Sequence, residues 1–294
     1  MTTRQVRPIL CFLAGSVLAT SLFAQAPAPK LAFPNTSQTA SVKQQVGVTD
    51  IEVNYARPSV KGRTIFGGLV PYGEVWRTGA NTATKISFST AVKLNGAAVP
   101  AGTYEFFTIP GKTEWTIILQ GLGERTQWGA YGYDQKHDTV RVTATPTTLA
   151  NTVESLSIGF SDLRSNAATL NIAWEKTRVP VKLEVDVVGQ LVPQIEAVMA
   201  SAEPKKPYFP AAMFYFENDL DLKKAIEWID AGLAEQPTAF FMTYRKGLIL
   251  AKAGDKAGAI VAAQQSLEMA KKATPPALRE EYVRLNEALI ASLQ

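Results

Sequence analysis

Cysteine is almost absent from this chain of 294 residues, which contains only Cys11. Two arginines precede an apolar run from Ile9 to Leu22, and Ala24-Gln25-Ala26 has the small-x-small pattern of a cleavage site, so residues 1–26 are predicted to be a secretory signal peptide. We therefore expect a mature chain with no disulfide and no thiolate nucleophile. An export signal without further cysteines predicts a location in the periplasm of a Gram-negative bacterium.

Histidine is equally scarce, and His137 is the only one. With Asp134 and Asp138 it offers a weak metal-binding pattern, because zinc sites normally use several nitrogen or sulfur ligands. An exposed turn is the favoured interpretation. The mature chain also lacks a Gly-x-Ser-x-Gly motif, a phosphate-binding loop and a dinucleotide fingerprint. We expect no catalytic residue, no metal site and no cofactor.

A strong charge of one sign is absent too. The chain has 30 basic and 26 acidic residues, a net charge of +4, and removal of the two signal-peptide arginines leaves 28 against 26, or +2. Without a basic block, nucleic acid is not an expected partner. Without a second long apolar run, we expect a soluble protein with no membrane span once the signal peptide is removed.

Alternation of apolar and polar residues dominates residues 46–188. Leu156, Ile158 and Phe160 alternate with serine and glycine, and the run Val181-Lys182-Leu183-Glu184-Val185 has the same period of two. This pattern is typical of antiparallel strands with one buried face. Asn95-Gly96 predicts a tight hairpin turn. About nine or ten short strands predict an antiparallel β-sandwich, jelly-roll-like in strand count. The polar, proline-containing residues 27–45 before it are expected to form a flexible lead-in.

From residue 189 the apolar period becomes helical. Asp221, Ala225, Ile226 and Leu233 recur 34 residues later as Asp255, Ala259, Ile260 and Leu267, the period of a tetratricopeptide helix pair. We expect helices over residues 190–202, 209–217, 221–235, 239–253, 256–272 and 276–293. The predicted fold class is therefore α+β, an antiparallel β-sandwich over 46–188 followed by an all-α, tetratricopeptide-like helical domain over 189–294.

Several longer motifs resemble a known family. They include Arg57-Pro58, Lys61-Gly62-Arg63, Val75-Trp76-Arg77-Thr78-Gly79-Ala80-Asn81 and Pro100-Ala101-Gly102-Thr103-Tyr104. These motifs are similar to the signature of the secreted bacterial family catalogued as domain of unknown function 2911, whose members often carry a similar helical C-terminal segment. The resemblance implies export and this two-part architecture. It implies no activity, because the family has no established reaction or catalytic residues.

The loop at residues 55–84 is the main candidate binding site. Arginine forks bind carboxylate, phosphate or sulfate, and glycines let such a ligand approach the backbone. An anionic or carbohydrate small molecule is the expected ligand. The candidate ligand residues are Arg57, Lys61, Arg63, Trp76, Arg77 and Asn81. The alternative is structural: the arginines pair with Glu52, Glu74 or Glu105 and fix the loop over the sheet, and Trp76 belongs to the core.

A second candidate is the aromatic run Trp128-Gly129-Ala130-Tyr131-Gly132-Tyr133. Flat aromatic faces can hold sugar rings, and β-sandwiches are common carbohydrate scaffolds. Packing in the core or on an edge strand is the favoured interpretation, although the two glycines make a regular strand doubtful.

The helical repeat is a candidate for protein or peptide contact, since stacked helix pairs form a concave groove. The alternative is that the helices dock on the sandwich through an exposed Trp228 and a nearby aromatic run, Tyr208, Phe209, Phe214, Tyr215 and Phe216.

Together these features predict a non-catalytic, exported binding or interaction protein, with a ligand-recognising loop on the sandwich and a helical repeat for protein contact. Two alternatives stay open. One is a carbohydrate-active hydrolase that uses loop carboxylates, Glu74 with Glu105 or Asp134. The other is a purely structural scaffold.

Overall fold

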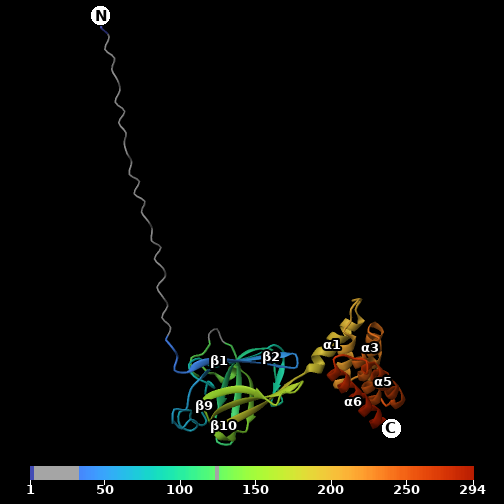
Figure 1. Cartoon of the computed structure of the whole chain (residues 1–294). Coiled ribbons are helices and arrows are strands. Elements are labelled where there is room, and N and C mark those ends of the chain that lie inside the picture. Colours follow the sequence, from blue (N-terminus) through green and yellow to red (C-terminus); the bar gives the residue numbers. More distant parts are fainter. Residues whose placement is uncertain (3–32, 123–125) are drawn as a thin grey trace. The chain divides into compact units, whose positions relative to one another are not determined.

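The computed structural model describes residues 1–2, 33–122 and 126–294. The predicted signal peptide lies outside the described residues, apart from its first two. Strands come first in the described chain and helices follow them (Figure 1). This order confirms the predicted α+β class. No helix in the described ranges is long and apolar enough to cross a membrane.

The strands form two antiparallel sheets. One has six strands in the order β1-β2-β3-β6-β7-β8, and the other has four in the order β5-β4-β10-β9. Most neighbours in the larger sheet follow one another along the chain. The strands are β1 (Gln38–Val46), β2 (Thr49–Arg57), β3 (Thr84–Phe88), β4 (Val92–Leu94), β5 (Ala97–Val99), β6 (Gly102–Ile109), β7 (Trp115–Gly121), β8 (Asp138–Ala144), β9 (Thr147–Ser161) and β10 (Ala167–Val185).

The core of the sandwich follows from the alternation along these strands. Leu156 and Ile158 of β9 are buried, as are Val181 and Leu183 of β10. Burying such side chains contributes roughly 1.5–3 kcal/mol each. Since no disulfide is expected in the mature chain, packing of this kind must hold the sandwich together.

The flexible lead-in predicted over residues 27–45 is wrong from residue 38 onward, because β1 begins at Gln38. Ala40 and Val42 pack against the core, while Ser41 and Lys43 are exposed on the other face. A sheet-edge strand with one partly buried face contains few apolar residues and carries charged and polar side chains. This composition makes β1 resemble a disordered segment in the sequence.

Six helices follow the last strand. They are α1 (Val187–Ala200), α2 (Tyr208–Glu217), α3 (Leu222–Glu235), α4 (Phe240–Lys252), α5 (Lys256–Ala270) and α6 (Pro276–Leu293), each within a few residues of its predicted range. The repeated aspartates cap helices: Asp221 accepts hydrogen bonds from the Lys223 and Lys224 amides, and Asp255 accepts one from the Gly258 amide. The tetratricopeptide-like assignment itself stays a prediction.

The expected exposure of Trp228 is wrong. Its side chain is only 8% exposed, and its ring centroid lies 4.7 Å from that of the buried Tyr215. Ala225, Trp228 and Ile229 form one buried stripe of α3, at the spacing that places residues on the same face of a helix. These aromatic residues therefore build the core of the helical domain.

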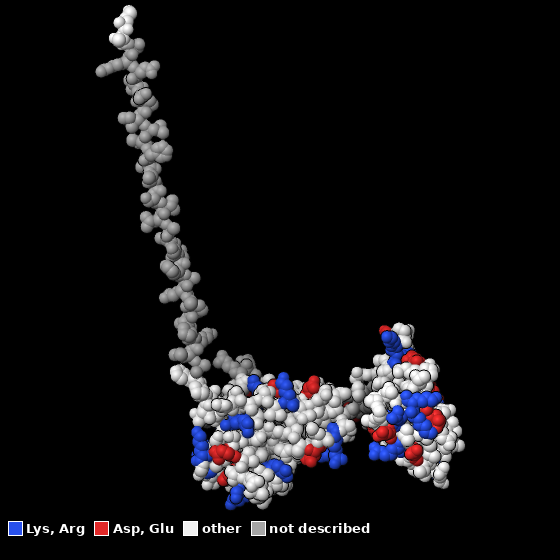
Figure 2. Space-filling view, in the orientation of Figure 1, with Lys and Arg blue, Asp and Glu red and all other residues white. Residues whose placement is uncertain are grey.

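Lys and Arg are intermixed with Asp and Glu on the face drawn in Figure 2. This face shows no large patch of one charge, in agreement with the nearly balanced composition.

Candidate functional site

Trp76, one of the predicted ligand residues, lies in the core of the sandwich. Its side chain is 7% exposed, and its indole Nε1 donates to the Gly79 carbonyl at 3.1 Å. Its backbone pairs with Thr108 at the end of β6 through two hydrogen bonds, of 2.7 and 2.9 Å. The geometry supports the structural interpretation of this tryptophan.

Arg57, Lys61 and Arg63 are tied to neighbouring backbone and to β9. Arg57 Nε donates to the Leu156 carbonyl at 2.8 Å, and the Lys61 amide donates to Glu154 Oε1 at 3.0 Å. Arg63 donates to two carbonyls of its own loop, those of Ser59 and Val60, at 2.6 and 3.0 Å. These bonds stabilise the shape of the loop.

Among the described residues, the predicted pairing of the loop arginines with carboxylates is wrong. Glu52 pairs instead with Lys43, at 3.3 Å between Nζ and Oε2. Backbone carbonyls take the place of the expected acidic partners, and nothing in the sequence distinguishes these two kinds of acceptor for an arginine.

Arg77 differs from the other loop cations because it lies on the outer side of the six-stranded sheet. Alternation places it on the same side as Val75, which packs against Phe107 and Ile118 outside the main core. Its Nε is buried and has no hydrogen-bond partner in the part of the chain that the structure describes. Burial lowers the pKa of the Arg77 guanidinium, and the nearby Tyr131 opposes that effect. A buried donor of this kind is available to a ligand or a water molecule.

The chain crosses the outer side of the sheet again at residues 126–133, which we call the cover segment. The Ala83 amide donates to the Gln127 carbonyl at 2.9 Å, and the Gly129 amide donates to the Asn81 carbonyl at 3.0 Å. Asn81 in turn donates through Nδ2 to the Ser37 carbonyl at 3.3 Å. Asn81 therefore holds the cover segment and the start of the sandwich together.

A buried carboxylate anchors the cover segment to the sheet. Glu105 of β6 is fully buried, and its two oxygens accept hydrogen bonds of 2.7 Å from the Gln127 amide and from Gln127 Nε2. Gln127 Nε2 also donates to Oε1 of the buried Gln120 at 2.8 Å. Because both oxygens of Glu105 are engaged, this carboxylate has a positioning role in the structure.

The other carboxylates considered for hydrolysis are not gathered around an open site. Asp134 forms an ion pair with Lys136 at 2.6 Å, and Glu74 is exposed in its loop. His137 is exposed in a short 3-10 turn, as the sequence indicates. No group of three or more His, Cys, Asp or Glu side chains that could hold a metal occurs among the described residues.

A hydrogen-bonded triad fixes the end of the cover segment. The Tyr133 hydroxyl donates to Asp138 Oδ2 at 2.7 Å and accepts from Arg141 Nη1 at 2.8 Å. Its ring lies 5.4 Å from that of Phe107. Burial, aided by Asp138, raises the pKa of Tyr133 to about 12.

Two aromatic side chains of the cover segment face solvent. Trp128 is 64% exposed and Tyr131 is 90% exposed, so the favoured packing interpretation is wrong for these two and correct for Tyr133. Gly129 has a φ of +71°, and its Cα faces the Tyr131 ring so closely that a Cβ there would lie 2.8 Å from the ring. In the sequence, the glycines predict only that a regular strand is interrupted here. They do not predict the turn that brings the two rings to the surface. We call Arg77, Trp128 and Tyr131 the aromatic rim.

Comparison with known proteins adds a family but no function. The family model described as "Protein of unknown function (DUF2911)" matches residues 37–183, from the residue before β1 to near the end of β10. No curated protein and no solved structure matches the chain. The match includes the loop at residues 55–84 and the cover segment. The chain therefore belongs to the DUF2911 family of proteins of unknown function.

Proposed function

We propose that this protein is an exported, periplasmic binding protein that holds a saccharide bearing an acidic group at the aromatic rim, without catalysing a reaction on it. The observation that supports the proposal most is the exposure of Trp128 and Tyr131 on one short segment, with Tyr131 near enough to the half-buried Arg77 to influence its pKa. Exposed apolar side chains that are grouped into a patch mark candidate interaction sites. Their placement on a rigid sandwich is typical of binding loops.

The chemistry of the three side chains suits an acidic sugar. The apolar face of an indole or phenol ring can cover a sugar ring and keep polar edges in contact with water. A guanidinium binds a carboxylate or sulfate through two parallel hydrogen bonds. In this arrangement Trp128 and Tyr131 provide contact area, and Arg77 selects the negative group.

The rim is held ready for a ligand by the bonds beneath it. Gln127, directly before Trp128, donates twice to Glu105, and Tyr133 is fixed by Asp138 and Arg141. A preorganised surface loses less conformational entropy on binding. The same bonds occupy Glu105 and Asp138, which is why we propose binding without catalysis.

We also propose that the helical domain contacts a protein or peptide partner. The recurrence of Asp221 and Asp255 as helix caps supports the 34-residue repeat on which that role depends.

A thermal-shift experiment on residues 27–294 tests the proposal. We expect trigalacturonate at millimolar concentration to raise the melting temperature more than maltotriose does, because ligand at 100 times its Kd stabilises a fold by about 2.7 kcal/mol. Trp128→Ala should abolish both shifts, and Arg77→Gln should remove only the preference for the acidic sugar. Tyr72→Ala, at another partly exposed aromatic residue, is the matched control and should leave both shifts unchanged. Absence of any shift, or shifts that survive Trp128→Ala, would contradict the proposal.

A further inference from the structure

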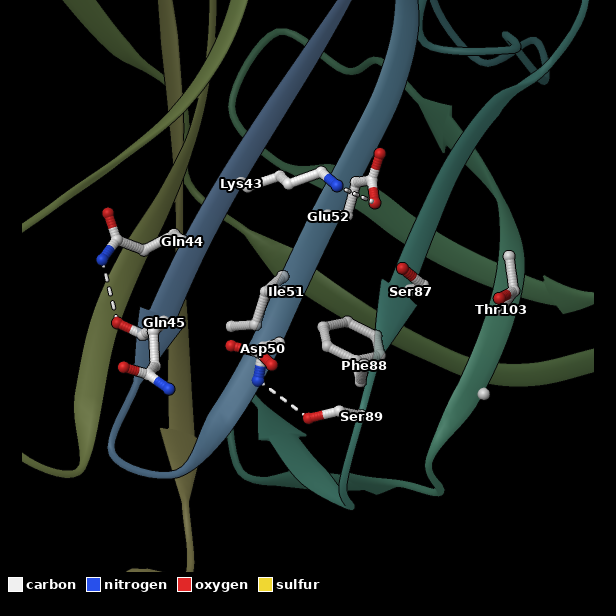
Figure 3. A pocket seen from close by; sticks show the side chains of 11 residues that line it. Lys43, Gln44, Gln45, Asp50, Ile51, Glu52, Ser87, Phe88, Ser89 and Thr103 are labelled. Carbon is white, nitrogen blue, oxygen red and sulfur yellow. Dashed lines mark hydrogen bonds and ion pairs between the residues drawn. The ribbon is translucent and has the colours of Figure 1, made fainter.

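Among the described residues, a pair of hollows lies on the outer face of the six-stranded sheet. The first has a volume of 370 Å³ and is lined by Asn54, Lys85 and Thr126, among others. The second has a volume of 610 Å³, and Figure 3 shows side chains of β1, β2, β3 and β6 around it, including Glu52 and Ser87.

The two hollows join at Glu52. This residue lines the second hollow, and its Oε1 accepts hydrogen bonds from Ser41 Oγ at 2.9 Å and from Asn54 Nδ2 at 3.0 Å, both of which line the first. Its other oxygen, Oε2, pairs with Lys43 at 3.3 Å (Figure 3). One hydrogen-bonded group thus lies at the boundary, so the two hollows are direct neighbours on the sheet.

The first hollow also reaches the aromatic rim. Thr82 and Thr126 line it, and Thr82 forms a β-bridge with Trp128. From Thr82 the chain enters β3, where Lys85 lines the first hollow and Ser87 the second. At about 3.3 Å per residue, Ser87 lies about 17 Å from Thr82 along the strand direction. The rim, the first hollow and the second hollow therefore follow one another along the direction of β3.

The side chains that line the two hollows are mainly polar. Hydroxyl, amide and ammonium groups from four adjacent strands provide both donors and acceptors. The Glu52 carboxylate pairs with Lys43, and Asp50 is a second carboxylate that lines the same hollow. Polar side chains on neighbouring strands of a rigid sheet suit the hydroxyl-rich edge of a sugar chain.

We propose that the six-stranded sheet binds an extended saccharide chain, with one acidic unit at the aromatic rim and the following units in the two hollows. This inference rests on the proposed function and adds the length and the path of the ligand.

Calorimetric titration of residues 27–294 with alternating glucuronate–N-acetylglucosamine oligosaccharides of two and six sugar units tests it. The hexasaccharide should bind at least tenfold more tightly than the disaccharide, because only the longer chain reaches the second hollow. Ser87→Glu places a negative charge in that hollow and should remove most of this difference while leaving disaccharide affinity unchanged. Ser87→Lys is the charge-reversed control and should retain the difference. Lys93→Gln in β4 removes an exposed cation of the other sheet and should have no effect.

The outcomes separate this inference from the proposed function. Equal affinity for both lengths, with loss of both on Trp128→Ala, overturns the extended path and leaves the rim as the site. A hexasaccharide preference that is unaffected by Ser87→Glu also overturns the path. Absence of binding at either length contradicts the rim and the path together.

Discussion

Trp76 and Trp174 stack in the core of the sandwich, with ring centroids 5.8 Å apart and an angle of 17° between the ring planes. Phe66 and Trp115 meet Trp76 edge to face at 5.9 and 6.4 Å. The residue after Trp76 is Arg77, on the outer side of the sheet. Two consecutive residues thus join an aromatic cluster of the core to the proposed binding surface, which gives Arg77 a rigid base.

Replacing Trp76 should cost much of the stability of the sandwich. We expect Trp76→Ala to lower the free energy of unfolding by about 3–5 kcal/mol, because it leaves a cavity among three aromatic rings. Urea denaturation provides the measurement. Trp128→Ala is the matched control and should change stability by less than about 0.5 kcal/mol, since its side chain faces solvent. Similar losses of stability for both variants would contradict the burial of Trp76 and the exposure of Trp128.

Glu105→Gln tests the anchor of the cover segment. The new amide cannot accept from both donors of Gln127, and reversing the Gln127 amide would leave Gln120 without its donor. We expect a loss of about 1–3 kcal/mol in the free energy of unfolding, the usual cost of an unsatisfied buried polar group. Glu74→Gln, at an exposed position, should be neutral. A neutral Glu105→Gln would show that the buried bonds do not hold the segment.

The pKa of Tyr133 predicts a specific dependence of stability on pH. The folded value is about 12, against about 10 in an unfolded chain. Folding therefore favours the neutral phenol: the contribution of Tyr133 is complete below about pH 10 and is lost as the pH rises toward about 12. The difference in unfolding free energy between wild type and Tyr133→Phe should be constant below about pH 10 and shrink above it. A difference that does not change between these limits would argue against the burial of the Tyr133 hydroxyl and its bond to Asp138.

Gly129→Ala should damage the rim with only a moderate effect on stability. A side chain at φ +71° is strained, and its Cβ would lie 2.8 Å from the Tyr131 ring. We expect a stability loss of about 1 kcal/mol and a clear loss of saccharide affinity, measured by calorimetry.

Gly96→Ala is a close control for that variant, because Gly96 has a φ of +86° with no atom near the added Cβ. It should lose similar stability and keep saccharide affinity. If Gly129→Ala also kept its affinity, Tyr131 would have no part in binding.

Much of the fold could be predicted because its signals are local. Alternation marks the strands, and Asp221 and Asp255 mark the starts of two helices through their capping bonds. The candidate site was harder to predict from the sequence, because its geometry depends on contacts between segments that are far apart along the chain. The sequence shows that Arg57 and Arg77 are cations in one loop, but only the fold shows that Arg57 meets the Leu156 carbonyl while Arg77 is half-buried and lies near Tyr131. Likewise, Trp128 and Trp76 differ in exposure for reasons that their neighbours in sequence do not reveal.

Acrylamide quenching of tryptophan fluorescence tests the central claim most directly. Of the five tryptophans, Trp76, Trp115, Trp174 and Trp228 are buried and Trp128 is 64% exposed, so the quenchable signal should come from Trp128. We predict that the alternating glucuronate–N-acetylglucosamine hexasaccharide protects this signal from acrylamide, and that Trp128→Phe has almost no quenchable signal to protect. If the hexasaccharide left Trp128 as quenchable as in the free protein, the aromatic rim would not be the binding site.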